Sequence, residues 1–144
     1  MKRRMGLILI LFAVCLGALP AAADDFDGSK PLLCSMFSVV ECTPEGQCSN
    51  VTPESVSLPL FVKIDPAAKT VRPARQTEDN RSSEIKFVAR VGGRLVLQGA
   101  EGGPEEQKRG RGWTASVSEE TGRFVLTVSA EDVAFVVFGA CLAL

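Results

Sequence analysis

The chain has 144 residues, with 16 lysines and arginines against 17 aspartates and glutamates, and it contains no histidine and no tyrosine. This balance argues against nucleic acids and anionic membranes as partners, because both require a basic surface. The lack of histidine excludes a Cys/His zinc site and the serine–histidine and cysteine–histidine catalytic pairs. The length suits one domain.

The N-terminus has the organisation of a secretory signal peptide. A basic start (residues 2–4) and an apolar run (6–19) are followed by three alanines before Asp24. This is the pattern of a cleaved signal, whereas a retained membrane anchor needs about 20 apolar residues. We expect a signal peptide over residues 1–23 and a single β-domain over 24–144. The protein is therefore predicted to be periplasmic or secreted, with no membrane span after cleavage.

The C-terminal part of the chain has the clearest strand pattern. Residues 113–117 and 124–128 alternate apolar and polar side chains, as strands with one buried face do. Both apolar sets share a face only if a four-residue loop at 119–122 pairs Val117 with Phe124. Ala115 then pairs with Leu126, Trp113 pairs with Val128, and Gly122 supplies the positive φ that the loop needs.

The same parity predicts the next strand. Val128 is expected to pair with Val133, so that Phe135 continues the buried face. Residues 133–142 are apolar on both faces, as are residues 31–42. We expect these two segments to pair and close a barrel.

The remaining segments predict shorter strands with hairpin-length connections. The expected strands cover residues 58–65, 69–72, 84–91 and 94–100, residues 49–57 are a connector, and two loops without periodicity cover 73–83 and 101–111. The sequence thus predicts an all-β fold: a small antiparallel up-and-down β-barrel or curved sandwich of about eight short strands.

One hairpin has two possible registers. A two-residue loop at Gly92-Gly93 pairs Val91 with Arg94 and places the apolar residues of the two strands on opposite faces of the hairpin. A three-residue loop that includes Arg94 pairs Val91 with Leu95 instead, and we prefer it. The predicted inward set is then bulky: Phe87, Leu97, Trp113, Phe124, Leu126 and Phe135.

Four cysteines remain after the predicted signal, and in an exported domain they indicate two disulfides, with three possible connectivities. Cys34 and Cys42 lie on one strand, about 26 Å apart at ~3.3 Å per residue, so they cannot bond to each other. The Pro-Glu-Gly turn before Cys48 favours Cys42–Cys48. This pairing leaves Cys34–Cys141 to join the first and last strands. No metal or cofactor is expected.

At the level of motifs, the chain resembles a family of small secreted bacterial β-proteins of unknown function. The resemblance rests on an export signal combined with the segments PLLCS, EC-x5-C, GW, EETGR and the terminal FVVFGAC. It implies a secreted β-protein and no particular activity. The W…TGR hairpin is also similar to hairpins of lipocalin- and avidin-like barrels.

Two loops carry the candidate binding residues. Lys108, Arg109 and Arg111 form a basic cluster beside Trp113, and Arg72, Arg75 and Arg81 offer a second cluster. Either could receive an acidic partner or an anionic glycan, although nearby acidic residues also fit an ordinary solvated loop. No catalytic constellation stands out.

We therefore predict an exported, non-enzymatic binding module whose partner is an envelope protein or glycan. Two alternatives remain: a lipocalin-like carrier of a small apolar ligand, and a weak carboxylate-based hydrolase. The bulky inward set favours a packed interior and binding through the loops. A cavity of several hundred Å³ would favour the carrier instead.

Overall fold

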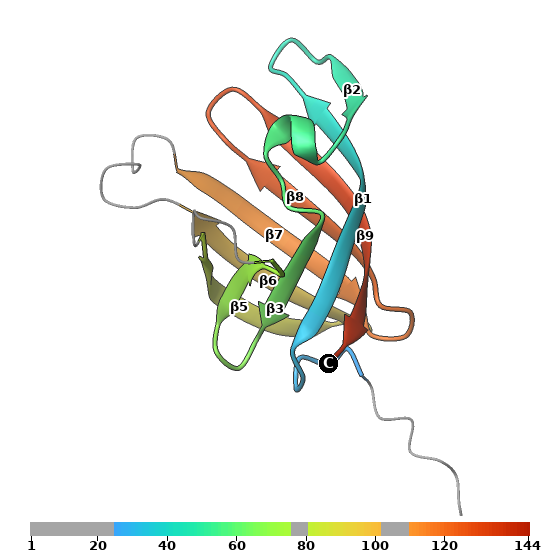
Figure 1. Cartoon of the computed structure of the whole chain (residues 1–144). Helices are drawn as coiled ribbons and strands as arrows, with labels where there is room; N and C mark the ends of the chain where they lie inside the picture. Colours follow the sequence, from blue (N-terminus) through green and yellow to red (C-terminus); the bar gives the residue numbers. More distant parts are fainter. Residues whose placement is uncertain (1–24, 76–80, 102–109) are drawn as a thin grey trace, which may run out of the picture.

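The computed structural model describes residues 25–75, 81–101 and 110–144. These residues form nine antiparallel strands and one 3-10 turn, η2 (Glu54–Val56). The strands, coloured along the chain in Figure 1, are β1 (Leu32–Cys42), β2 (Cys48–Val51), β3 (Phe61–Asp65), β4 (Thr70–Pro73), β5 (Ser83–Val91), β6 (Arg94–Glu101), β7 (Arg111–Ser118), β8 (Arg123–Ser129) and β9 (Ala134–Ala143).

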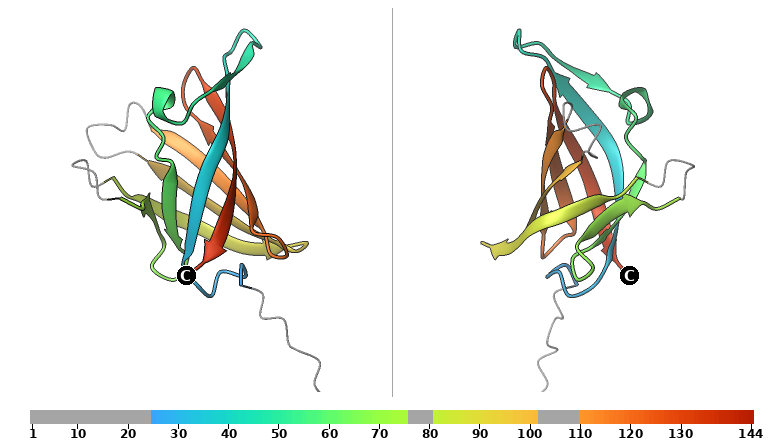
Figure 2. Two further views of the ribbon diagram at one scale, coloured as in Figure 1. Left: turned by 45° about the vertical axis from the view of Figure 1, so that its right-hand side comes forward. Right: turned by 90° about the vertical axis from the view of Figure 1, so that its left-hand side faces the viewer.

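Strands β3 to β9 pair in sequence order, and β1 lies between β9 and β3. The result is a closed barrel of eight strands with β2 as an extra strand on β1. Figures 1 and 2 show the strands wrapped into this barrel, with β2 projecting beyond one end. The all-β prediction and the closure by the first and last strands are both confirmed, because β1 pairs with β9 from Leu32 to Cys42.

The predicted β7–β8 register is confirmed. Val117 pairs with Phe124, the other two predicted pairs follow, and Gly122 has a φ of 66°. The predicted β8–β9 pairing is wrong by two residues, because Val128 pairs with Phe135 rather than with Val133. The longer turn is held by a hydrogen bond that the Ala130 N–H donates to the carbonyl of Val133 (2.9 Å). A shift of two residues preserves parity, so the buried face is unchanged.

The preferred β5–β6 register is wrong. Val91 pairs with Arg94 across a two-residue turn, in which Gly92 and Gly93 have φ values of 57° and 75°. Positive φ at both central positions defines the hairpin turn that matches strand twist. The inward face of β6 still matches that of β5 at Ile85, because a β-bulge between Ile85 and Phe87 inserts an extra residue. Phe87 therefore lies on the outer face, with half of its side chain exposed.

Residues 49–51 were expected in a connector but form β2, which pairs with the end of β1. Cys42 and Cys48 are opposite each other in this short ladder and are bonded (S–S 2.04 Å). Cys34 and Cys141 are paired in the same way between β1 and β9 and are also bonded (S–S 2.07 Å). The structure thus has the two predicted bridges, one at a hairpin tip and one across the barrel seam.

An N-terminal turn lies at one end of the barrel, which we call the base. It consists of residues 25–30, at the lower end of the barrel in Figure 1. Gly28 lies against Leu95 and Pro66, and Phe26 packs against Gly122 and the core. Apolar contacts therefore join this turn to the base of the barrel.

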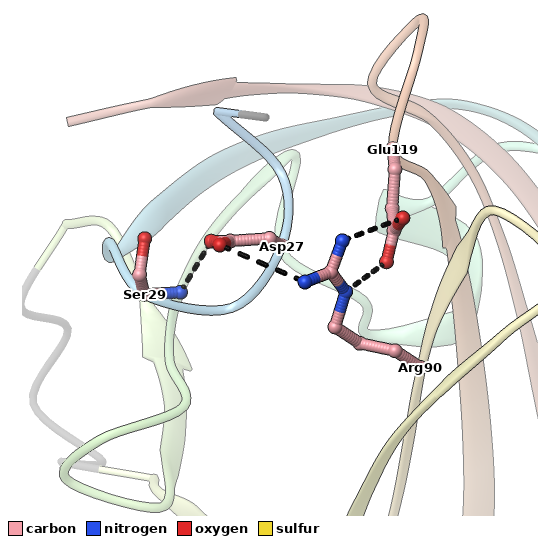
Figure 3. A network of polar contacts seen from close by, with 4 residues as sticks. All are labelled: Asp27, Ser29, Arg90 and Glu119. Atoms are coloured by element: carbon pink, nitrogen blue, oxygen red, sulfur yellow. Dashed lines mark hydrogen bonds and ion pairs between the residues drawn. The ribbon is translucent and has the colours of Figure 1, made fainter. Parts of the chain in front are cut away.

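A polar network ties this turn to the barrel (Figure 3). Arg90 of β5 donates two hydrogen bonds to Glu119, at 2.6 Å from Nε and 3.0 Å from Nη2, and its Nη1 lies 3.9 Å from Asp27. The hydrogen bond from Arg90 lowers the pKa of Glu119. Hydrogen bonds from the side chain and the backbone N–H of Ser29 lower the pKa of Asp27, and the charge of Arg90 acts in the same direction. Both carboxylates are thus held in their charged form.

The base network predicts how stability depends on pH. Because its pKa is lower in the folded state, the Glu119 carboxylate stabilises the fold at any pH above its ordinary value of about 4.3. This contribution is lost as the pH falls through the folded-state pKa. Glu119→Gln should therefore lower the free energy of unfolding more at pH 7 than at pH 3, as measured by urea unfolding. Glu120→Gln, at the exposed neighbouring position, is the control, and a loss from Glu119→Gln that does not shrink as the pH falls would contradict the assignment.

Candidate functional site: a cavity at the barrel mouth

A cavity of about 380 Å³ opens at the end of the barrel opposite the base, which we call the mouth. Strands β1 and β3 to β8 contribute to its wall, as do residues 57–59 before β3. The lining residues are Met36, Ser57, Leu58, Pro59, Val62, Ile64, Val71, Arg72, Pro73, Arg81, Ser83, Glu101, Arg111, Trp113, Ala115, Phe124, Leu126 and Val128.

The expectation of a solidly packed interior is therefore wrong. Phe87, counted as a filling residue, faces outward because of the β5 bulge. Another inward position, Ala115, has a small side chain and lines the cavity. An eight-stranded barrel is close to the size at which side chains just fill the interior or leave room for one ligand. Without the Phe87 ring, and with only a methyl group at position 115, the interior keeps such room here.

Trp113 is both a core residue and part of the cavity wall. Its indole lies directly over Gly99, where a Cβ atom would overlap the ring, and only 9% of the residue is exposed. The indole N–H donates a hydrogen bond to the hydroxyl of Ser83 (2.6 Å), which donates in turn to the carbonyl of Ala100 (3.2 Å). The polar atoms of this part of the wall thus satisfy one another, and the surface offered to the interior is apolar.

Charged side chains gather at the mouth. Glu101 and Arg111 are directly opposite each other in the β6–β7 ladder, two residues beyond the inward pair Gly99 and Trp113. Strand alternation therefore places both on the cavity side of the sheet. Arg81 lies two residues before the inward-facing Ser83 and also lines the mouth. Together with Arg72, the rim has three arginines and one glutamate.

The structure brings together predicted candidates from two separate loops. Arg72 and Arg111 both line the mouth, although alternation places Arg72 on the outer face opposite Lys63. Arg75 is exposed just after β4 and does not line the cavity. Lys108 and Arg109 lie outside the described residues. Arg81, from the same predicted loop as Arg75, also lines the mouth, whereas sequence reasoning missed Glu101, because only the register of β6 and β7 identifies it as a rim residue.

The rest of the described chain offers little for other chemistry. Within residues 25–75, 81–101 and 110–144, no group of three or more cysteine or acidic side chains could hold a metal ion. In the same ranges, no helix is long and apolar enough to cross a membrane. Glu101 is the one carboxylate among the described residues that line the cavity, whereas glycoside hydrolysis normally uses a pair.

Comparisons with known proteins add no relative. No protein-family model, no curated protein and no solved structure matches the chain. The resemblance to small secreted bacterial β-proteins and to lipocalin-like hairpins therefore remains a prediction. What can be inferred about function comes from the mostly apolar cavity and its charged rim.

Proposed function

We propose that the protein is an exported, non-enzymatic barrel that binds one small, mainly apolar ligand in the cavity at its mouth. The observation that carries the proposal is the cavity of about 380 Å³, which lies within the ~300–1,000 Å³ usual for ligand pockets. Its wall is mostly apolar, its charged residues lie at the mouth, and Phe26 of the N-terminal turn packs against the core at the far end. A ligand would therefore enter and leave through the mouth.

Export is supported by the signal-like N-terminus and by the two disulfides, which persist in oxidising compartments. In the alternative, Lys108 and Arg109, which lie outside the described residues, would bind an envelope protein or glycan, but the cavity favours a small ligand. A carboxylate-based hydrolase lacks a second acidic residue among the described cavity residues.

The single tryptophan provides a direct test. Trp113 lines the cavity, and the chain has no other tryptophan and no tyrosine, so its emission reports on this site alone. Titration with the neutral apolar probe N-phenyl-1-naphthylamine should change the Trp113 emission in a saturable way, with one probe bound per chain. Probe fluorescence should rise over the same concentration range.

A blocking variant locates the binding. Ala115 is buried in the cavity wall, so Ala115→Phe should fill part of the cavity and reduce probe affinity by at least about tenfold. The matched control is Thr127→Phe, which adds the same side chain at an exposed outer position of β8. Probe binding that is absent from the wild type, or equal in the two variants, would contradict the proposal.

A further inference from the structure

We infer that the ligand is an anionic amphiphile, a molecule with one apolar chain and a negatively charged head group held at the arginine rim. This inference rests on the proposed function and names its ligand class. Polarity along the cavity is the first argument. The wall near Trp113, Phe124 and Val128 is apolar, and the buried Ser83 hydroxyl is already hydrogen-bonded to Trp113 and Ala100. A buried polar or charged ligand group would find no partner there.

Charge at the mouth is the second argument. Among the described residues of the rim, Arg72, Arg81 and Arg111 accompany Glu101, so the formal charge of these four is positive. The chain as a whole has a net charge of −1. These four residues lie where the head group of a ligand with a buried tail would emerge, and they would attract a negatively charged one.

Geometry favours Arg111 as the main contact. Arg111 is the first residue of β7, two positions before Trp113, so its side chain lies on the cavity face, and it is exposed at the rim. A guanidinium can donate paired hydrogen bonds to a carboxylate or a similar anion. Glu101, directly across the ladder on the same face, would repel the same anion. The two residues should thus affect the affinity for an anion in opposite directions.

The head group can be tested with three competitors that share one apolar chain and differ in charge: dodecanoate, dodecanol and dodecylammonium. The measurement is displacement of N-phenyl-1-naphthylamine from the wild-type protein, at competitor concentrations too low for micelles to form. We expect dodecanoate to compete best and dodecylammonium to compete worst. Raising the salt concentration should weaken dodecanoate selectively, because partly exposed charges are screened.

Rim variants test the assignment. Arg111→Gln should weaken dodecanoate by about fivefold, the effect of one partly exposed charged contact, and should weaken the neutral competitor dodecanol much less. Glu101→Gln should strengthen dodecanoate. Arg123→Gln, which removes the same charge at the exposed start of β8 by the base, is the control and should change neither affinity.

The outcomes distinguish this inference from the proposed function. If the probe binds in the cavity but the three competitors are equally effective, the cavity is a ligand site and the anionic head group is wrong. Equal dodecanoate affinity in the Arg111→Gln and Arg123→Gln variants would likewise overturn the role of Arg111. If neither the probe nor any competitor binds, the proposed function itself fails.

Discussion

Replacing Cys34 and Cys141 together by alanine should lower the free energy of unfolding by about 4 kcal/mol and the melting temperature by on the order of 15 °C. The bridge joins residues 107 positions apart, and such a loop restricts the unfolded chain by about 5 kcal/mol in the chain-entropy model. Both cysteines are also buried, so their loss disturbs the core. The double substitution avoids an unpaired thiol.

The second bridge is the matched control. Cys42 and Cys48 are only six positions apart, so the same model gives about 2.5 kcal/mol for their bridge. Cys48 lies exposed at a hairpin tip. Cys42→Ala with Cys48→Ala should therefore lower the melting temperature by less, in scanning calorimetry of both double variants. A larger loss from the hairpin bridge would refute the entropic account.

The sequence predicts strand pairing correctly where apolar and polar residues alternate without interruption. Between Trp113 and Val128 they do, and the length of one four-residue loop was enough to predict how the residues of β7 pair with those of β8. Along β5 they do not, since the bulge after Ile85 reverses the face of every later residue. Nothing in the local sequence marks this bulge, because Phe87, Ala89 and Val91 read as a continuous inward set.

The candidate site was less predictable than the fold. The volume left inside a barrel depends on the tilt and stagger of the strands as well as on the side chains that face inward. The tilt and the stagger cannot be read from the sequence. Arg72 and Arg111 were recognised as basic residues of separate loops, yet their shared position at the mouth depends on barrel closure. The small strand β2 was missed because four polar or β-branched residues after a turn carry no periodicity.

The contact between Gly139 and Phe124 yields the second large expected effect. Gly139 of β9 lies opposite Phe124 and Met36, and the Phe124 ring packs directly on its Cα. A Cβ atom at residue 139 would overlap both this ring and the carbonyl oxygen of Ser35. The ring is almost fully buried and the carbonyl belongs to the neighbouring strand, so neither can move without disturbing the barrel.

Gly139→Ala should therefore destabilise the protein by about 3 kcal/mol or more, at the upper end of the cost of overpacking a core. Gly112→Ala in β7 is the matched control, because among the described residues its Cβ would meet only the Ser129 hydroxyl, at 3.4 Å. That variant should stay within about 0.5 kcal/mol of the wild type, since the alanine also reduces the entropy of the unfolded chain. Urea unfolding followed by Trp113 fluorescence measures both. Equal stabilities for the two variants would contradict this prediction, because they would mean that the Phe124 ring does not pack on Gly139 of β9.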